Sequence, residues 1–297
     1  MLDSFEAGTF PNGWTLEAAS IKGKRLLAGG FRGAGLYQLF PASGTAHSPS
    51  LLYRYTAAAF AAAFGKDDEP GDLRPGTDYR LNVAAACVAA GGGKLRLQVD
   101  VYDSTPTLIQ EVITEIVLGT ALPADGVWRM ARSTAIRLTP SQAARVSYVD
   151  LRLVCLPVAG TYTADVDLRF DFVTFGALLD TNELGRCSPE DPFEADKEGL
   201  FDDEMSTART PFRVSFHTGI NAGIFTVRGI QPGGEREVTN FFRAAGGGRP
   251  MSVMYDLTEL SKDYYPLAIY DGDTDGLEQG IGAYADASIP WRETVAP

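Results

Sequence analysis

The stretch Lys94-Leu-Arg-Leu-Gln-Val-Asp-Val-Tyr-Asp103 alternates apolar and polar side chains residue by residue. A β-strand points successive side chains to opposite faces, so the stretch predicts a strand with one buried and one outward face. The segment from Arg145 to Cys155 repeats this pattern. The predicted buried row consists of Leu95, Leu97, Val99, Val101, Val149, Leu151, Leu153 and Cys155. These two segments place the chain in the mainly β class.

Shorter alternating segments flank these two strands, at 79–84 and 166–175. Turn-forming residues separate the segments: Arg74-Pro-Gly-Thr77, Gly91-Gly-Gly93, Pro123-Ala-Asp-Gly126 and Ala159-Gly160. Several short strands at this spacing are typical of an antiparallel β-sandwich. The segment from Tyr53 to Phe64 stays open between strand and helix, because its alanines also suit a helix.

The length of 297 residues exceeds that of a usual single domain, which predicts two domains. Residues 1–180 carry the strand pattern of the sandwich. Residues 181–205 are acidic and contain proline, which predicts a linker. Residues 206–297 combine further strand patterns with a short helical pattern at 235–245, which predicts a small α+β domain.

The charge balance excludes one class of partner. The chain has 26 Lys and Arg against 38 Asp and Glu, a net charge of −12, with no cluster of basic residues of the kind that binds nucleic acid. Its three cysteines, Cys87, Cys155 and Cys187, match no zinc or redox spacing and are interpreted as free thiols, buried in the case of the first two. The N-terminus lacks the basic and apolar regions of a secretory signal, so we expect synthesis in the cytoplasm and no membrane insertion.

Sequence motifs of catalysis are missing, so we expect no enzymatic activity. The histidines, His47 and His217, lie in no metal or nucleophile motif, and neither a phosphate-binding loop nor a nucleophile elbow occurs. A glycosidase needs only two carboxylates across a cleft, which sequence alone leaves open. The loop Asp271-Gly-Asp-Thr-Asp-Gly276 matches half of an EF-hand, but Gly282 stands where the bidentate Glu belongs, which favours a hairpin turn.

Residues 3–176 resemble the galactose-binding-like jelly rolls typified by carbohydrate-binding modules. Four pieces carry the resemblance in the family's order: Asp3-Ser-Phe-Glu-Ala-Gly-Thr-Phe-Pro-Asn-Gly-Trp14, the stretch from Gly23 to Gln38, Leu73-Arg-Pro-Gly-Thr-Asp-Tyr79 and Leu168-Arg-Phe-Asp-Phe-Val-Thr-Phe175. The resemblance implies a jelly-roll fold. It does not imply sugar binding, because such jelly rolls also serve as structural and adhesion modules.

The resemblance also suggests two kinds of site. Many of these modules hold a structural Ca²⁺ between their first and last strands, and Glu6 and Asp171 stand at matching places, although a plain polar residue at a strand end is the alternative for Asp171. The outward row of the paired strands is the candidate ligand face: Arg96, Gln98, Asp100, Tyr102, Tyr148, Asp150 and Arg152. Ordinary cross-strand ion pairs are the competing interpretation of that row. Tyr53 and Tyr55 are ligand candidates only if their segment is a strand, whereas Trp14 and Trp128 are interpreted as core or rim residues.

The C-terminal part is similar to small domains of tailed-phage tail and baseplate proteins, on the residues from Glu237 to Asp256 and from Tyr264 to Asp271. This similarity implies a structural component of a virion, in the tail tip, baseplate or fibre-attachment region, with copies around a symmetry axis and other virion proteins as partners. A carbohydrate-binding protein or accessory module that contacts a cell-surface glycan is the alternative. Aromatic residues that we expect at the protein interface are Phe241, Phe242, Tyr264, Tyr265 and Trp291.

Overall fold

The computed structural model describes residues 2–3, 14–17, 23–26, 29–31, 36–56, 73, 75–177, 186–187, 196–198, 201–205, 211–215, 220–230, 234–235, 238–239, 242, 250–254, 264–270, 277–279 and 285–293. Contacts divide the chain into two units, Met1–Leu178 with Met254–Tyr264 and Leu179–Val253 with Tyr265–Pro297. No helix among the described residues is long and apolar enough to span a membrane.

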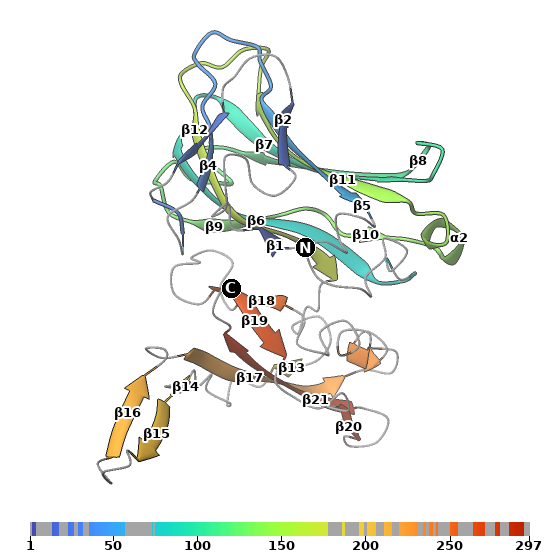
Figure 1. The fold of residues 1–297 in the computed structure, drawn as a ribbon. Coiled ribbons are helices and arrows are strands. Elements are labelled where there is room, and N and C mark those ends of the chain that lie inside the picture. The colour runs from blue at the N-terminus through green and yellow to red at the C-terminus, as the bar shows by residue number, and fades with distance from the viewer. Residues whose placement is uncertain are drawn as a thin grey trace. The chain divides into compact units, whose positions relative to one another are not determined.

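The first unit contains two antiparallel sheets, drawn from blue to yellow-green in Figure 1. The seven-stranded sheet consists of β1 (Leu2–Asp3), β3 (Gly23–Leu26), β4 (Leu36–Leu39), β6 (Asp78–Ala89), β9 (Arg129–Arg132), β10 (Ile136–Arg137) and β12 (Asp167–Ala177). The five-stranded sheet has the order β2-β5-β11-β7-β8, with β2 (Trp14–Glu17), β5 (Ser50–Thr56), β7 (Gly93–Tyr102), β8 (Leu108–Val117) and β11 (Tyr148–Pro157). The predicted mainly β class and the N-terminal antiparallel sandwich are confirmed.

One hydrophobic core lies between the two sheets. All eight side chains of the predicted buried row are fully buried in it, together with residues from the seven-stranded sheet such as Leu81, Val83 and Phe170. Cys87 and Cys155 are free and buried, and burial raises the pKa of the Cys155 thiol to about 12. The prediction of buried free thiols therefore holds for these two cysteines.

Strand β12 departs from the simple alternation that its sequence suggests. A β-bulge lies between Asp171 and Val173, and Phe172 has a φ of 43°, which is uncommon for a residue with a side chain. The bulge lets both Phe170 and Val173 face the core although they are three positions apart. The extra residue leaves the carboxylate of Asp171 fully buried, where it accepts hydrogen bonds from the backbone N–H groups of Phe31 and Phe172.

The short helix α2 (Pro140–Ala143) precedes β11 and begins at an N-cap, Thr139. The Thr139 hydroxyl accepts a hydrogen bond from the N–H of Gln142, and the side-chain carbonyl oxygen of Gln142 accepts one from the N–H of Thr139. This reciprocal pair satisfies donors that a helix start otherwise leaves open.

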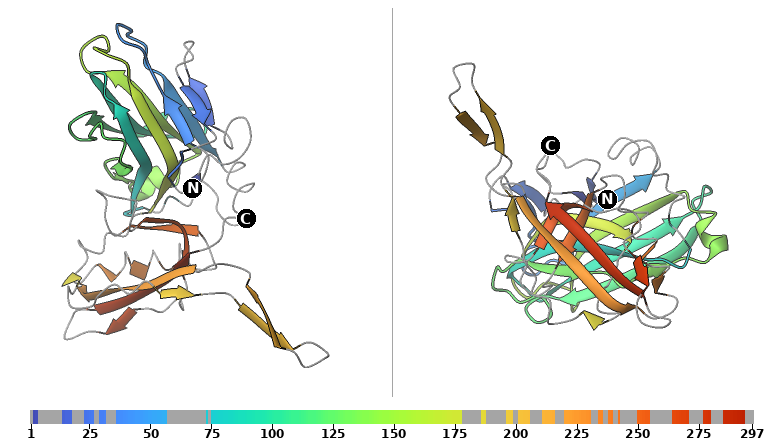
Figure 2. Two further views of the ribbon diagram at one scale, coloured as in Figure 1. Left: turned by 90° about the vertical axis from the view of Figure 1, so that its left-hand side faces the viewer. Right: turned by 90° about the horizontal axis from the view of Figure 1, so that it is seen from below.

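The described residues of the second unit form mainly strands. One sheet contains β13 (Arg186–Cys187), β14 (Asp196–Glu198), β17 (Ile220–Ile230), β18 (Pro250–Met254), β19 (Tyr264–Tyr270), β20 (Leu277–Gln279) and β21 (Ala285–Glu293). Strands β15 (Phe201–Met205) and β16 (Pro211–Ser215) pair with each other, and the long strands β17 and β21 lie side by side (Figure 2). Glu235, Val238, Thr239 and Phe242 are helical, so a helical contribution is present but the α+β class of this part is not clearly shown.

Three of these strands lie within 181–205, the segment predicted to be an acidic linker. Strands β13 and β14 pair with β17, and β15 pairs with β16, so the described residues of this segment belong to sheets. The sequence is ambiguous here because charged residues and proline are also what short edge strands carry.

The loop between β7 and β8 is organised by one carboxylate. Oδ1 of Asp103 accepts hydrogen bonds from the N–H groups of Thr105 and Thr107, at 2.9 and 3.0 Å, and Oδ2 accepts one from Arg145 at 2.8 Å. The hydrogen bond from Arg145 holds the pKa of Asp103 well below its usual range. The loop is thereby tied to the segment that leads into β11.

We expect Asp103→Ala to lower the thermal midpoint at pH 7 by about 2–4 °C. A carboxylate whose pKa is lower in the folded than in the unfolded state stabilises the fold at neutral pH, and this contribution is lost as the pH falls below about 4. Thermal unfolding of wild type and variant at pH 7 and at about pH 3 should therefore show a difference that shrinks in acid. An equal difference at both pH values would contradict this role.

The turn between β6 and β7 requires glycine at Gly91. Its φ is +49°, and a Cβ there would lie 2.7 Å from the carbonyl oxygen of Asp165 and closer still to that of Ala164. Gly160 provides a matched control, because its φ is +69° and a Cβ would meet nothing within 4 Å.

Gly160→Ala should cost about 1–2 kcal/mol from backbone strain alone. Gly91→Ala adds a steric clash with backbone atoms and should cost more than about 3 kcal/mol. Chemical denaturation of both variants measures the difference. Equal losses would show that the neighbouring backbone moves aside without cost.

Candidate functional site

The outward face of the five-stranded sheet carries all seven side chains predicted to form a ligand face. Strands β7 and β11 pair so that Tyr102 lies opposite Tyr148, Asp100 opposite Asp150 and Gln98 opposite Arg152. Because inward positions in both strands fill the core, these polar residues fall on the other side of the sheet. The register of the pair therefore brings residues about 50 positions apart in sequence into direct contact.

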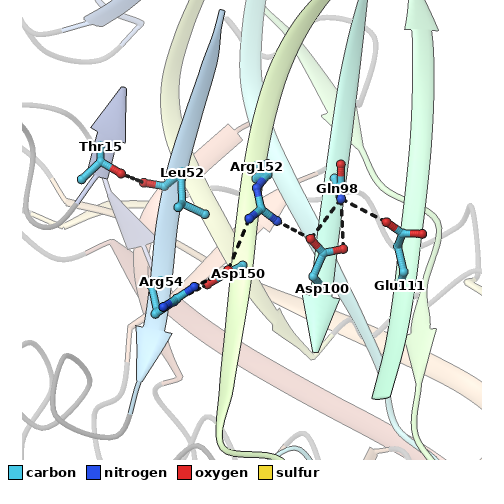
Figure 3. A network of polar contacts seen from close by, with 8 residues as sticks. All are labelled: Thr15, Leu52, Arg54, Gln98, Asp100, Glu111, Asp150 and Arg152. Carbon is cyan, nitrogen blue, oxygen red and sulfur yellow. Dashed lines mark hydrogen bonds and ion pairs between the residues drawn. The ribbon is translucent and has the colours of Figure 1, made fainter. Parts of the chain in front are cut away.

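Guanidinium and carboxylate groups alternate across the sheet, as Figure 3 shows. Arg54 on β5 donates two hydrogen bonds to Asp150, with Nε–Oδ1 at 2.7 Å and Nη2–Oδ2 at 2.8 Å. Arg152 contacts both Asp100, through Nη1, and Asp150, with Nη2–Oδ2 at 3.4 Å. The side chains of Asp150 and Asp100 are 1% and 3% exposed, whereas that of Arg54 is 52% exposed. The arginines therefore cover the carboxylates.

Gln98 extends this network to the edge strand β8. Its Nε2 lies 3.1 and 3.0 Å from the two oxygens of Asp100 and 3.1 Å from Oε1 of Glu111. The reverse orientation of the amide would place its carbonyl oxygen against two carboxylates, so electrostatics fixes the donor on this side. Within the part of the chain that the structure describes, Oε1 of Gln98 has no protein partner.

A second set of ion pairs continues the face along β7 and β8. Glu115 accepts hydrogen bonds from Lys94 at 2.6 Å and from Nη2 of Arg96 at 2.6 Å. The hydrogen bond from Lys94 lowers the pKa of Glu115 most, and the one from Arg96 lowers it further. Arg96 thus belongs to the predicted row but pairs toward β8 rather than toward β11.

Two tyrosines and one guanidinium form a layered stack. The rings of Tyr102 and Tyr148 lie 4.9 Å apart at an interplanar angle of 18°. The guanidinium carbon of Arg54 lies 4.4 Å from the centre of the Tyr148 ring. Since β11 lies between β5 and β7, Arg54 and Tyr102 approach Tyr148 from opposite sides. Tyr148 therefore offers no open ring face for a sugar.

The charges of this face balance. Among the side chains described on it, the cations are Arg54, Lys94, Arg96 and Arg152, and the anions are Asp100, Glu111, Glu115 and Asp150. Each cation contacts at least one carboxylate. The cross-strand ion pairs that the sequence offered as the competing interpretation are thus present, and the face has no surplus of either sign.

An apolar strip borders the polar network on the edge strand. Leu108, Ile113 and Val117 of β8 are 47%, 42% and 41% exposed. Glu111 and Glu115 alternate with them on the same side of the strand. Charged residues on an edge strand discourage pairing with another chain, which suits a strand that stays at the border of the sheet.

Sequence reasoning missed Arg54, Lys94, Glu111 and Glu115, which complete the network. The signal for Arg54 was the alternation of 50–56, which a helical alternative obscured. Segment 50–56 is a strand, but Tyr53 and Tyr55 are only 6% and 7% exposed and face the core, so their conditional prediction as ligand residues is wrong. Trp14 is 2% exposed in the core, as predicted.

The predicted calcium pair is only partly described. Asp171 is fully buried, and its carboxylate accepts hydrogen bonds from two backbone N–H groups. Glu6 lies outside the described residues. No group of three or more His, Cys, Asp or Glu suited to a metal occurs among the described residues. The structural Ca²⁺ stays a prediction.

The predicted interface aromatics differ among themselves. Phe242 and Trp291 are each 1% exposed, so these two side chains pack inside and the prediction that they lie at an interface is wrong. Sequence composition gives the number of aromatic residues in this part of the chain, but it does not show which of them pack in the core. Phe241 lies outside the described residues, and only the backbones of Tyr264 and Tyr265 are described.

No protein-family model matches this chain, and the search of curated proteins found no match. Solved structures do match. The CBM22-1 xylan-binding domain from Paenibacillus barcinonensis Xyn10C has 14% identity and a TM-score of 0.37, covering 61% of this chain and 94% of that one. The family 11 carbohydrate-binding module of the Clostridium thermocellum cellulase Lic26A-Cel5E has 10% identity and a TM-score of 0.35, covering 60% and 94%.

A third match is the enzymatically active domain of tailspike protein 4 from bacteriophage CBA120, with 9% identity and a TM-score of 0.37. It covers 56% of this chain, which spans only 19% of that protein. Carbohydrate-binding modules and a phage tailspike domain are thus among the solved structures that match. Neither the fold described above nor the site rests on these matches.

Removing Arg152 tests the network directly. Arg152→Ala would leave Asp100 and Asp150 buried and opposed, and we expect a loss of about 3 kcal/mol in the free energy of unfolding at pH 7. The loss should be smaller at acidic pH, because burial raises the pKa of Asp100 and its protonation removes one of the two opposed charges. Arg137→Ala, which breaks an exposed pair with Asp78, is the control and should cost less than about 1 kcal/mol. Similar losses in the two variants would contradict a buried role for Arg152.

Proposed function

We propose that this chain is a non-catalytic binding protein that holds a neutral glycan on the outward face of its five-stranded sheet. The observation that carries the proposal is the charge-balanced network of Arg54, Gln98, Asp100, Asp150 and Arg152, which fixes donors and acceptors in alternation across neighbouring strands (Figure 3).

A sugar hydroxyl both donates and accepts hydrogen bonds, so a surface that binds several hydroxyls needs both functions at fixed positions. Gln98 supplies an acceptor, Oε1, whose direction is set by the two carboxylates behind it. Arg54 supplies donors at Nη1, since its Nε and Nη2 are held by Asp150. The half-buried ring of Tyr102, which stacks on Tyr148, and the exposed apolar side chain of Ile113 add surfaces for the C–H side of a sugar ring.

The balance of charge favours a neutral ligand over an anionic one. Every cation described on the face is already bound to a carboxylate, so a sulfate or uronate would have to compete with Asp150, Asp100 or Glu115. The net charge of −12 adds a repulsive field for polyanions.

The pairing of the two central carboxylates, Asp100 and Asp150, with arginine side chains also supports a binding role. Asp100 and Asp150 accept hydrogen bonds from arginines that cover them, whereas a glycosidase needs one acid and one base on either side of an accessible bond. The absence of catalytic activity is part of this proposal.

The biological setting stays a prediction. Placement in a tailed-phage tail tip, baseplate or fibre-attachment region, with virion partners and copies around a symmetry axis, is supported by the sequence similarity of the C-terminal part alone.

Glycan binding is tested by affinity electrophoresis and array binding of the full chain on neutral and acidic polysaccharides. We expect retention on at least one neutral polysaccharide. Arg54→Ala and Gln98→Met should each weaken it about tenfold or more, since each loses hydrogen bonds to the ligand. Arg137→Ala on the other sheet is the control and should bind as the wild type does. Retention on acidic polysaccharides only, or on none, would refute the proposal.

A further inference from the structure

The two carboxylates at the centre of the face oppose one another. Asp100 and Asp150 are direct cross-strand partners, and their side chains are 3% and 1% exposed. Like charges at opposed positions of a sheet destabilise it, and burial adds a desolvation cost. A sheet selected for stability alone has no need of both carboxylates at this place.

The two carboxylates differ in the hydrogen-bond donors that compensate their charge. Asp150 receives a bidentate guanidinium from Arg54, which compensates its charge well. Asp100 accepts hydrogen bonds from one guanidinium nitrogen of Arg152 and from the amide nitrogen of Gln98. The compensation of Asp100 is therefore the weaker of the two.

The electrostatics of Asp100 point the same way. Burial raises the pKa of Asp100 above its usual value, and the nearby carboxylates of Glu111 on β8 and Asp150 on β11 raise it further, against the opposing effects of Gln98 and Arg152. A carboxyl group whose pKa is higher in the folded than in the unfolded state favours folding at low pH, and this contribution is lost as the pH rises. At neutral pH the charge of Asp100 therefore costs stability.

We propose that Asp100 is a positioning residue of the binding face, kept at the expense of stability because it fixes the side chains of Gln98 and Arg152 for the ligand. Both carboxylate oxygens of Asp100 accept hydrogen bonds from the amide nitrogen of Gln98. The carbonyl oxygen of Gln98 is therefore directed away from Asp100 and Glu111. Its contact with Nη1 of Arg152 keeps that guanidinium spread between β7 and β11. This inference rests on the proposed glycan-binding function and names the residue that sets its geometry.

Asp100→Asn separates positioning from support of the fold. Asparagine keeps the size of the side chain but removes the charge that locks the Gln98 amide. We expect the thermal midpoint of the full chain at pH 7, without ligand, to be unchanged or higher. Affinity for the neutral polysaccharide that retains the wild type should fall about tenfold or more. Asp78→Asn, on the seven-stranded sheet, is the matched control and should leave this affinity unchanged.

A coupling measurement gives a second readout that a structural role would not produce. If part of the effect of Asp100 passes through Gln98, the double variant Asp100→Asn/Gln98→Met should lose less affinity than the sum of the two single losses. Fully additive losses would show that Asp100 does not act through Gln98, and would overturn the inference.

The remaining outcomes are distinct. A lower midpoint for Asp100→Asn together with weaker binding would make Asp100 a structural residue, and unchanged binding would remove it from the site; either result overturns the inference while glycan binding by the wild type stands. Failure of the wild type itself to be retained on any neutral polysaccharide refutes the proposed function, and the inference with it.

Discussion

The strands of the five-stranded sheet bury one side against the core, and the rest of the molecule follows from that requirement. Leu95, Leu97, Val99 and Val101 on β7 are completely buried, as are their counterparts on β11. A shift of one residue between these strands would turn the four core side chains of one strand outward, so the register is strongly fixed. The same register sets Asp100 against Asp150 and Tyr102 against Tyr148. The geometry of the polar face is therefore a consequence of core packing.

The polar face in turn has to manage the charges that this register imposes. Arg152 lies between the two opposed carboxylates, and Arg54 neutralises Asp150 from the neighbouring strand. Buried ion pairs contribute little net stability compared with apolar residues of the same size, but removing one partner is expensive. A network of this kind is rigid and directional rather than strongly stabilising. Those properties suit a surface that recognises a ligand by hydrogen bonds.

The seven-stranded sheet meets a different constraint at its centre. Two core residues of β12, Phe170 and Val173, are separated by an odd number of positions, and only the bulge at Phe172 lets both face inward. The bulge buries Asp171, whose carboxylate then binds the backbone of residues 31 and 172. Asp171, which the family resemblance suggests as a metal ligand, thus joins the backbone at residue 31 to strand β12. Its relation to Ca²⁺ depends on Glu6, outside the described residues.

Local patterns in the sequence determined the mainly β class, the buried rows of β7 and β11, the glycine turn at Gly91–Gly93 and the seven residues of the outward row. Period-two alternation records which face of a strand is buried, and each of these features is local in sequence. Tertiary structure decided between strand and helix for residues 50–56, which places Arg54 on the face and Tyr53 and Tyr55 in the core. It alone decided that Glu111 joins the face, that Phe242 and Trp291 are buried, and that β12 contains a bulge. These outcomes depend on which strands become neighbours and on how their side chains fill the core, and alternation within one strand carries no information about the strand beside it.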